Sequence, residues 1–236
     1  GHGVTFLVDA GYRDLSVLGM GGTVSQDQGF HEQLAAHGTT VEDLDFVILT
    51  HAHRDHAGHV DKVPMHIPLV INRAELSWAA SGMQGHAYAR DDVLHLIKRM
   101  YTPGAIRFLD LETSGPESIA PGVVASTCGG HTPGSIAITV PTEQGDAYLC
   151  GDLIYDVRGA LSEQPRDSFV GRVQPTALAL DDPAMTNNFA VSPLQELGAL
   201  KHARQHRFVL AAHDAPAIVE AGKWVAYIQG DTIPAP

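Results

Sequence analysis

Four side chains that can bind a metal ion fall within the six residues from His51 to His56. They are His51, His53, Asp55 and His56, in the sequence Thr-His-Ala-His-Arg-Asp-His-Ala-Gly-His. Imidazole and carboxylate groups gain little from packing against one another, and burying them without partners is costly. We therefore interpret the cluster as half of a two-metal hydrolytic site, whose remaining ligands lie further along the chain.

The spacing of the cluster suggests how two ions would share it. Side chains alternate along an extended segment, so His51 and His53 project to the same side and can bind one metal. Asp55 and His56 come about one turn later and can reach a second metal. Zinc suits this mixture of ligands. Because two histidines and a carboxylate also describe a non-haem iron site, the ligand types leave the identity of the metal open.

Three further candidate ligands stand beside glycine or directly after a predicted strand. His131 lies in Gly-Gly-His-Thr-Pro-Gly, Asp152 in Leu-Cys-Gly-Asp, and His213 in Leu-Ala-Ala-His-Asp. Glycine lets the backbone turn sharply and lets a metal approach closely. These residues are our candidates for the other half of the site.

The elements that must position these ligands follow from the apolar patterns. The run Phe-Val-Ile-Leu at 46–49 predicts a short buried strand that delivers the first cluster at its carboxyl end, where layered α/β folds build their sites. Further strands are predicted at 4–8, 67–71, 105–109, 123–127, 135–140, 147–150 and 208–211, and helices at 28–37, 73–81, 91–101, 193–205 and 215–221. Residues 12–26 and 156–192 are expected to be loops near the site. This order favours an α+β fold of layered αββα type, in a single domain over residues 1–236.

Composition narrows the classes of partner. A net charge of −12 argues against a nucleic-acid backbone, and no apolar run approaches the ~20 residues that span a bilayer. Cys128 and Cys150 are expected to be buried thiols rather than a disulfide framework. The absence of a signal pattern indicates a cytoplasmic protein. Because the chain starts Gly-His-Gly, a secreted or periplasmic location stays open, as does a homodimer.

The complete set of motifs resembles the metallo-β-lactamase superfamily, from Asp9 to about Asp214. The resemblance implies an αββα sandwich with the site at the sheet edges, and two Zn²⁺ as cofactors, with Fe or Mn as alternatives. The ligands that it implies are His51, His53 and His131 for the first metal, Asp55, His56 and His213 for the second, and Asp152 as a bridge.

The reaction implied by the resemblance is hydrolysis. A hydroxide bridging two cations ~3.5–4 Å apart is available at neutral pH, because metal binding lowers the pKa of water toward ~7. It attacks an electrophilic carbon or phosphorus, and Asp55 is a candidate general base.

Within the superfamily the sequence is most similar to the N-acyl homoserine lactone lactonases, which act in quorum quenching. Tyr155 stands three residues after Asp152, where those enzymes carry a tyrosine that assists the substrate carbonyl. Residues 67–76 are similar to their strand followed by an Arg-Ala-Glu helix start. True β-lactamases carry Cys or Ser in place of Asp152. Arg54 departs from the lactonase pattern, which favours an apolar residue there, and a cation at this position favours a polar or anionic substrate.

The leading hypothesis is therefore a dinuclear zinc hydrolase that opens a lactone or related ester of small size. Alternatives are a phosphoester or phosphotriester hydrolase on the same metals, a mononuclear iron persulfide dioxygenase, and a metal-binding module without activity. A tyrosine packed in the core is an equal interpretation of Tyr155. Asp9 is either a support for the metal-site loops or a plain turn residue.

Overall fold

The computed structural model describes residues 3–13, 29–83, 87–161 and 193–228. Most of the predicted loops at 12–26 and 156–192 lies outside these ranges. The chain divides into two compact units, Gly1–Asp110 and Leu111–Pro236, each with its own sheet. The single domain over residues 1–236 stays a prediction.

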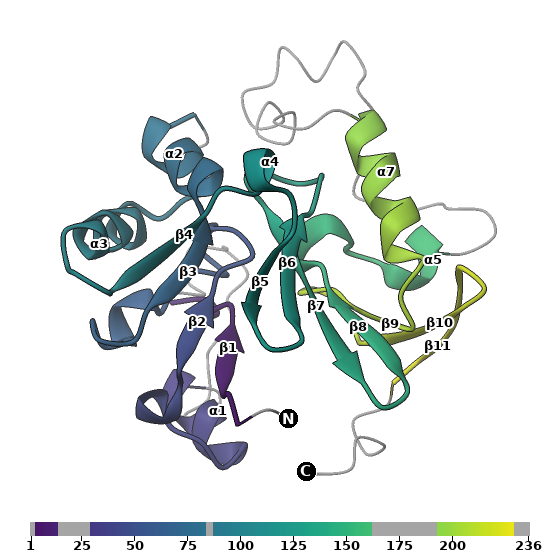
Figure 1. The fold of residues 1–236 in the computed structure, drawn as a ribbon, viewed down its shortest axis with the longest axis horizontal. Coiled ribbons are helices and arrows are strands. Elements are labelled where there is room, and N and C mark those ends of the chain that lie inside the picture. The colour runs from purple at the N-terminus through teal and green to yellow at the C-terminus, as the bar shows by residue number, and fades with distance from the viewer. Residues whose placement is uncertain (1–2, 14–28, 84–86, 162–192, 229–236) are drawn as a thin grey trace, which may run out of the picture. The chain divides into compact units, whose positions relative to one another are not determined.

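The first unit is built on a four-stranded parallel sheet in the order β1-β2-β3-β4 (Figure 1). The strands are β1 (Phe6–Val8), β2 (Phe46–Ile48), β3 (Leu69–Asn72) and β4 (Ile106–Leu109). Parallel strands are usually apolar on both faces, and Val47, Ile48 and Leu49 are indeed fully buried. The carboxyl end of β2 leads directly into the histidine cluster, as the sequence predicts.

In the described ranges, three helices accompany this sheet. They are α1 (Phe30–Ala36), α2 (Arg73–Ser81) and α3 (Arg90–Met100), and short 3₁₀ turns cover Val41–Asp43 and Val60–Lys62. Helix α2 packs against β3 and α3, and α3 also packs against β4 (Figure 1). Helix α2 ends at Gly82, whose φ of 76° is the left-handed conformation that glycine adopts without strain.

The guanidinium of Arg99 is fully buried at the centre of the first unit. It donates hydrogen bonds to the carbonyl oxygens of Ile67 and Ala105, at 3.0 Å each, and to that of Val63. Burial lowers the pKa of Arg99 to about 10, so the group stays charged at neutral pH. Through these hydrogen bonds, Arg99 of helix α3 stabilises the turn before β3.

The second unit contains a seven-stranded sheet in the order β11-β10-β9-β8-β7-β6-β5. The strands are β5 (Glu117–Ala120), β6 (Val123–Thr127), β7 (Ile136–Thr142), β8 (Gly145–Leu149), β9 (Phe208–Leu210), β10 (Ala217–Glu220) and β11 (Lys223–Tyr227). All neighbouring pairs are antiparallel except β8 and β9. Because β8 and β9 are parallel, their carboxyl ends meet at one edge of the sheet.

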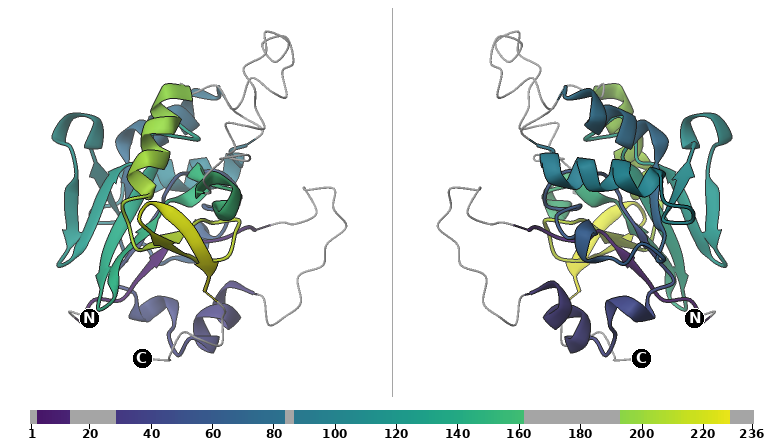
Figure 2. Two further views of the ribbon diagram at one scale, coloured as in Figure 1. Left: turned by 90° about the vertical axis from the view of Figure 1, so that its right-hand side faces the viewer. Right: turned by 90° about the vertical axis from the view of Figure 1, so that its left-hand side faces the viewer.

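The described part of the second unit also contains helices α4 (Leu111–Ser114), α5 (Val157–Leu161) and α7 (Pro193–Ala203) and a 3₁₀ turn at Gly151–Leu153. Helix α5 lies against β10 and β11 (Figure 2). Its buried residues join an apolar cluster with Tyr148 and Val209 of the central strands.

The predicted α+β class is confirmed, but one predicted element is wrong. The helix expected at 215–221 is strand β10, which pairs with β9 and β11. Its sequence Ala-Ile-Val-Glu alternates between buried and more exposed positions, which is the period of a strand. The alanines around it suggested a helix, whereas β-branched Ile218 and Val219 fit a sheet better.

Strands β5 and β11 and helices α4 and α5 were not predicted, because each has only four or five residues and no clear periodicity. Cys128 and Cys150 are buried free thiols, as expected. None of the helices in the described ranges combines the length and apolar character that a membrane crossing requires.

Candidate metal centre

The first group of candidate ligands follows β2. His51 and His53 are both buried, and the distance from Nε2 of His51 to Nδ1 of His53 is 3.1 Å. Two nitrogens bound to one tetrahedral zinc at 2.0–2.1 Å lie roughly 3.3 Å apart. The two nitrogens are therefore close enough to bind one ion, which is the arrangement that their alternate spacing predicts.

Asp55 and His56 form a second pair in the same unit. Oδ2 of Asp55 lies 3.6 Å from Nε2 of His56, with 31% of the Asp55 side chain exposed and only 2% of the His56 side chain. The His56 ring packs beside that of His51, with 3.9 Å between ring centroids. The two pairs therefore lie next to each other on one short segment.

The carboxylate of Asp9 fixes the orientation of this segment. Its Oδ2 accepts hydrogen bonds from Nδ1 of His56 and Oγ1 of Thr50, and its Oδ1 accepts one from the Thr50 backbone N–H, each at 2.8 Å. Because Nδ1 of His56 donates to Asp9, Nε2 is the nitrogen that faces the ligand cluster; carboxylates commonly orient metal-binding histidines in this way. Asp9 has a φ of 61°, uncommon for a residue with a side chain. Asp9 is thus a support of the site rather than a plain turn residue.

The loop after β1 is packed tightly against the cluster. The Ala10 N–H donates to the carbonyl oxygen of His56 at 2.6 Å, and the Gly58 N–H donates to that of Gly11 at 2.9 Å. A Cβ atom at Gly58 would lie only 2.4 Å from the backbone nitrogen of Arg13. Only glycine at position 58 permits this close approach.

Glu75, at the start of α2, contacts the ligand segment, and no sequence pattern singled it out. It is fully buried, and its Oε1 accepts hydrogen bonds from the Ala52 backbone N–H and from the Tyr88 hydroxyl, both at 2.9 Å. The Tyr88 ring packs against His53, with 4.6 Å between centroids. Glu75 therefore holds the peptide between the two histidines. The available signal was a glutamate between apolar neighbours in the Arg-Ala-Glu segment; nothing marked Tyr88.

Two further candidate ligands lie in the second unit, at the shared edge of β8 and β9. Leu149 and Leu210 are register partners, and Asp152 and His213 each follow three residues later. Oδ2 of Asp152 is 3.2 Å from Nε2 of His213 and 3.5 Å from Nε2 of His131. One buried carboxylate oxygen thus lies within ligand-sharing distance of two imidazoles.

His131 is held in a strained backbone conformation. Its φ is 68°, in the left-handed region that residues with a Cβ rarely adopt. The side chain of Ser135 donates hydrogen bonds to the carbonyl oxygens of Gly130 and Thr132, and the Cys128 N–H donates to that of Ser135 at 2.9 Å. Strain of this kind is typical of functional sites, which fits a ligand role for His131.

Tyr155 lies against the ligands of the second unit rather than in the apolar core. Its hydroxyl donates a hydrogen bond to Oδ2 of Asp152. Its ring is stacked on that of His213, with 4.8 Å between centroids and 8° between planes.

Asp214, directly after His213, links this segment to its neighbours. Its carboxylate accepts hydrogen bonds from the Val157 N–H at 2.7 Å and from the Tyr227 hydroxyl at 2.9 Å.

The donor chemistry in each unit fits divalent metal ions of the zinc or iron type. The atoms that would share an ion lie within 4.8 Å of one another in the pairs His51 with His53, Asp55 with His56, and Asp152 with His213. Asp55 is partly exposed and His213 is exposed, whereas the other five candidate ligands are buried: His51, His53, His56, His131 and Asp152. Imidazoles and carboxylates clustered in this way are compensated when they coordinate a metal.

Comparison with known proteins agrees with this chemistry. The family model described as the metallo-beta-lactamase superfamily matches residues 1–213. No curated protein sequence matches the chain.

Several solved structures share the fold. A variant of AiiA from B. thuringiensis, with N-decanoyl-L-homoserine bound at its active site, is 21% identical, with 87% of this chain and 74% of that chain covered and a TM-score of 0.58. A quorum-quenching N-acyl homoserine lactone lactonase is 22% identical over 87% of this chain and 72% of its own, with a TM-score of 0.58. AidC, a dizinc quorum-quenching lactonase, is 17% identical over 95% of this chain and 76% of its own, with a TM-score of 0.59.

At these identities the solved structures support the fold alone, whereas the family model covers most of the chain. The predicted family resemblance and its αββα fold class are both confirmed by that match. This chain is a member of the metallo-β-lactamase superfamily and a metal-dependent hydrolase.

Proposed function

We propose that the seven candidate ligands form one dinuclear site, and that the protein uses it to open a lactone or a related small ester. The ligand set of the proposal is His51, His53 and His131 for one ion, Asp55, His56 and His213 for the other, and Asp152 shared between them. The observation that carries it is the position of Asp152, whose Oδ2 lies near His131 and His213 at once.

Zinc is the first candidate for both ions, with iron or manganese as alternatives. Two such ions, when bound, supply Lewis acidity and lower the pKa of water toward ~7, which makes a nucleophile available at neutral pH. The chain must position the substrate and move the protons.

Asp55 is the candidate proton acceptor. Its side chain is partly exposed, so it can reach the solvent side of the cluster as well as the ligands. When the acyl C–O bond of the ring breaks, the leaving oxygen needs a proton, and Asp55 can return the one it accepted. The product is then the open hydroxy acid.

Tyr155 is the candidate donor to the substrate carbonyl. Its hydroxyl already faces the ligand cluster through Asp152, and stacking on His213 restricts its ring. A hydrogen bond to the carbonyl oxygen would stabilise the negative charge that develops there during attack.

The lactone class is supported by relatives of the same fold, whose structures contain N-acyl homoserine products or are those of quorum-quenching lactonases. A quorum-quenching role for this chain is part of the proposal. The partner is a small molecule, and neither a nucleic acid nor a membrane is proposed.

The test is metal analysis together with a hydrolysis screen. We expect two equivalents of zinc per chain, and turnover on a panel of lactones of graded acyl length. Asp152→Ala should lower the metal content and reduce kcat/KM by at least about 10³-fold, because it removes the shared ligand. Asp146→Ala, a carboxylate removed from an exposed position on β8, is the matched control and should behave like the wild type.

Other outcomes would identify the alternatives. Faster turnover of paraoxon or bis-nitrophenyl phosphate would favour a phosphoester hydrolase. One iron and no zinc would favour the persulfide dioxygenase. Two tightly bound zinc ions without turnover of any ester, thioester or lactone would indicate a metal-binding module and contradict the proposal.

A further inference from the structure

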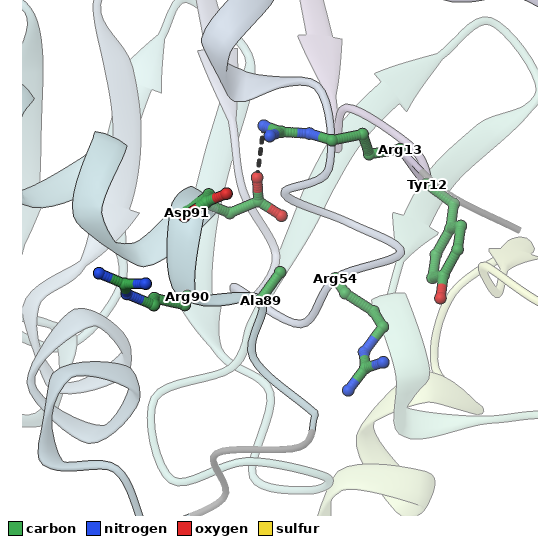
Figure 3. Close-up of a pocket in the computed structure, with 7 residues that line it drawn as sticks. Tyr12, Arg13, Arg54, Ala89, Arg90 and Asp91 are labelled. Atoms are coloured by element: carbon green, nitrogen blue, oxygen red, sulfur yellow. Dashed lines mark ion pairs between the residues drawn. The ribbon is translucent and has the colours of Figure 1, made fainter. Parts of the chain in front are cut away.

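A cavity of about 350 Å³ lies in the first unit beside the ligand segment. Its lining is rich in arginine: Tyr12, Arg13, Arg54, Ala89, Arg90, Asp91 and Asp92 (Figure 3). Arg54 stands between the candidate ligands His53 and Asp55, and consecutive Cα atoms are only about 3.8 Å apart. The volume is within the usual range for a small-molecule site, roughly 300–1,000 Å³.

Arg13 is already engaged in holding the unit together. Its Nη2 lies 2.6 Å from Oδ1 of Asp92 and 3.0 Å from Oδ1 of Asp61, and its Nε donates to the carbonyl oxygen of Gly58 at 2.7 Å. The dashed line in Figure 3 marks the ion pair that Arg13 makes within the lining. Two carboxylates therefore neutralise this arginine.

Arg54 is in a different situation. Its backbone N–H donates to the carbonyl oxygen of Ala87 at 3.0 Å, and its Nε reaches the same oxygen only at 3.5 Å. No carboxylate among the described residues lies within ion-pair distance of its guanidinium. Because the side chain is half-buried, an anion that met it would be partly shielded from water, which strengthens the interaction.

Tyr12 provides a second, independent sign of a ligand. Its hydroxyl oxygen is buried and has no hydrogen-bond partner within the described part of the chain. Figure 3 shows Tyr12 and Arg54 extending to the same side of the cavity, with the guanidinium of Arg13 on the other side. A buried hydroxyl without a partner is rare and calls for an explanation, which a bound acceptor group supplies.

The charge of the lining is unusual for this protein. It carries three arginines against two aspartates, in a chain with a net charge of −12. Arg90 and Asp91 are exposed at the start of α3, so the rim contributes one charge of each sign. Arg54 is thus the cation of the lining that remains for a bound anion.

We infer that this cavity binds a carboxylate of the substrate, and that Arg54 selects lactones or esters carrying such a group away from the scissile bond. This inference rests on the proposed function. The planar guanidinium can donate two parallel hydrogen bonds to a carboxylate, and the Tyr12 hydroxyl can donate a third. An apolar acyl chain would leave all these donors without partners, which disfavours it.

The experiment uses two γ-lactones that differ only in one terminal group. Both bear a three-carbon side chain on the ring carbon next to the ring oxygen; it ends in a carboxylate in one lactone and in a carboxamide in the other. For the zinc-loaded wild type we expect kcat/KM to be at least about 10-fold higher for the carboxylate, since hydrogen bonds to charged groups are the stronger ones.

Arg54→Gln should lower this carboxylate-to-carboxamide ratio by about 10- to 100-fold, chiefly through KM. Arg54→Lys should restore part of the ratio, because it keeps the charge but loses the planar fork. Tyr12→Phe should lower the ratio by a smaller factor. Raising the salt concentration should also lower it in the wild type.

Arg107→Gln is the matched control, because Arg107 is an exposed arginine of β4 that does not line the cavity. It should leave the ratio unchanged. Metal content, measured for every variant, shows whether the ligand segment is still formed.

Two results would overturn the inference while leaving the proposed function standing. One is equal turnover of both lactones by the wild type. The other is an equal fall for both lactones in Arg54→Gln, which would mean that Arg54 acts only on the structure. If the protein holds two metals but opens neither lactone nor any other ester, the proposed function fails and this inference fails with it.

Discussion

At the scale of single residues, the candidate ligands are positioned by carboxylates that would not themselves bind the metals. Asp9 accepts hydrogen bonds from Thr50 and from His56, and Glu75 accepts one from Ala52. The backbone on both sides of His51 is thereby fixed. Ligands that are held in place before a metal arrives lose less conformational entropy when they bind it.

Glu75→Gln tests this support. The change keeps the shape of the side chain but removes a charged acceptor from the Ala52 N–H and the Tyr88 hydroxyl. We expect zinc affinity to fall about 10- to 100-fold, as for other outer partners of metal ligands, and the free energy of unfolding to fall by about 1–3 kcal/mol. Competition with a chromophoric chelator and urea denaturation would measure the two effects.

Tyr88→Phe removes one of these two donors and should have a smaller effect on zinc affinity. Glu112→Gln, at an exposed position, is the matched control. Equal zinc affinities for Glu75→Gln and Glu112→Gln would show that Glu75 does not position the ligands.

At the scale of elements, parallel strands bring ligands together. The register of β8 with β9 places Asp152 and His213 at equal distances beyond paired residues, and β2 delivers its cluster at the carboxyl end of a parallel sheet. Helix α3 is tied to the loop after β1 by the ion pair of Asp92 with Arg13. That loop also contacts the chain just after the ligand segment, at Gly58, so the ion pair between Asp92 and Arg13 supports the site indirectly.

The burial of Asp92 in α3 predicts a pH dependence of stability. Burial raises the pKa of Asp92 to about 6, although Arg13 opposes the shift. Since an unfolded aspartate has a pKa of about 3.9, the folded protein binds more protons between about pH 4 and pH 6. The contribution of Asp92 to stability is therefore greatest below about pH 4 and falls as the pH rises through this window, by up to about 3 kcal/mol.

Asp92→Asn lacks this titration. The difference in unfolding free energy between the wild type and this variant should change steadily from pH 4 to pH 6 and stay constant above about pH 7, as measured by urea denaturation. A difference that does not vary with pH would show that Asp92 titrates normally.

At the scale of the whole molecule, the proposed site combines four ligands from residues 51–56 with three ligands that come much later in the chain, His131, Asp152 and His213. Bound metals would then stabilise the folded chain by mass action, by about 4 kcal/mol at a free metal concentration 1,000 times Kd. For a chain of this length each kcal/mol corresponds to about 2–4 °C in Tm.

Removing the metals with a chelator should therefore lower Tm by about 8–16 °C, and added zinc should restore it. His131→Ala, which removes one proposed ligand, should show a smaller shift on chelation. Scanning calorimetry of the two proteins with and without chelator is the measurement. A Tm that does not respond to metal removal would contradict the ligand set.

The sequence by itself determined the candidate ligands, the family and most of the elements. The ligands could be found because they are spaced for an extended segment and follow predicted strands, and helix α2 was predicted at Arg73–Ser81, with the bounds it has. These features depend on residues close together in the chain, where side-chain periodicity and glycine are informative.

Only the tertiary structure decided the supports, the cavity and the strand at Ala217–Glu220. Glu75 is 23 residues away in the sequence from Ala52, whose backbone N–H donates a hydrogen bond to it. Tyr12 and Arg54, which line the same cavity, are 42 residues apart in the sequence. Strand β10 forms because two neighbouring strands supply its hydrogen bonds. Such contacts arise from how distant segments pack, which is why local sequence patterns do not contain them.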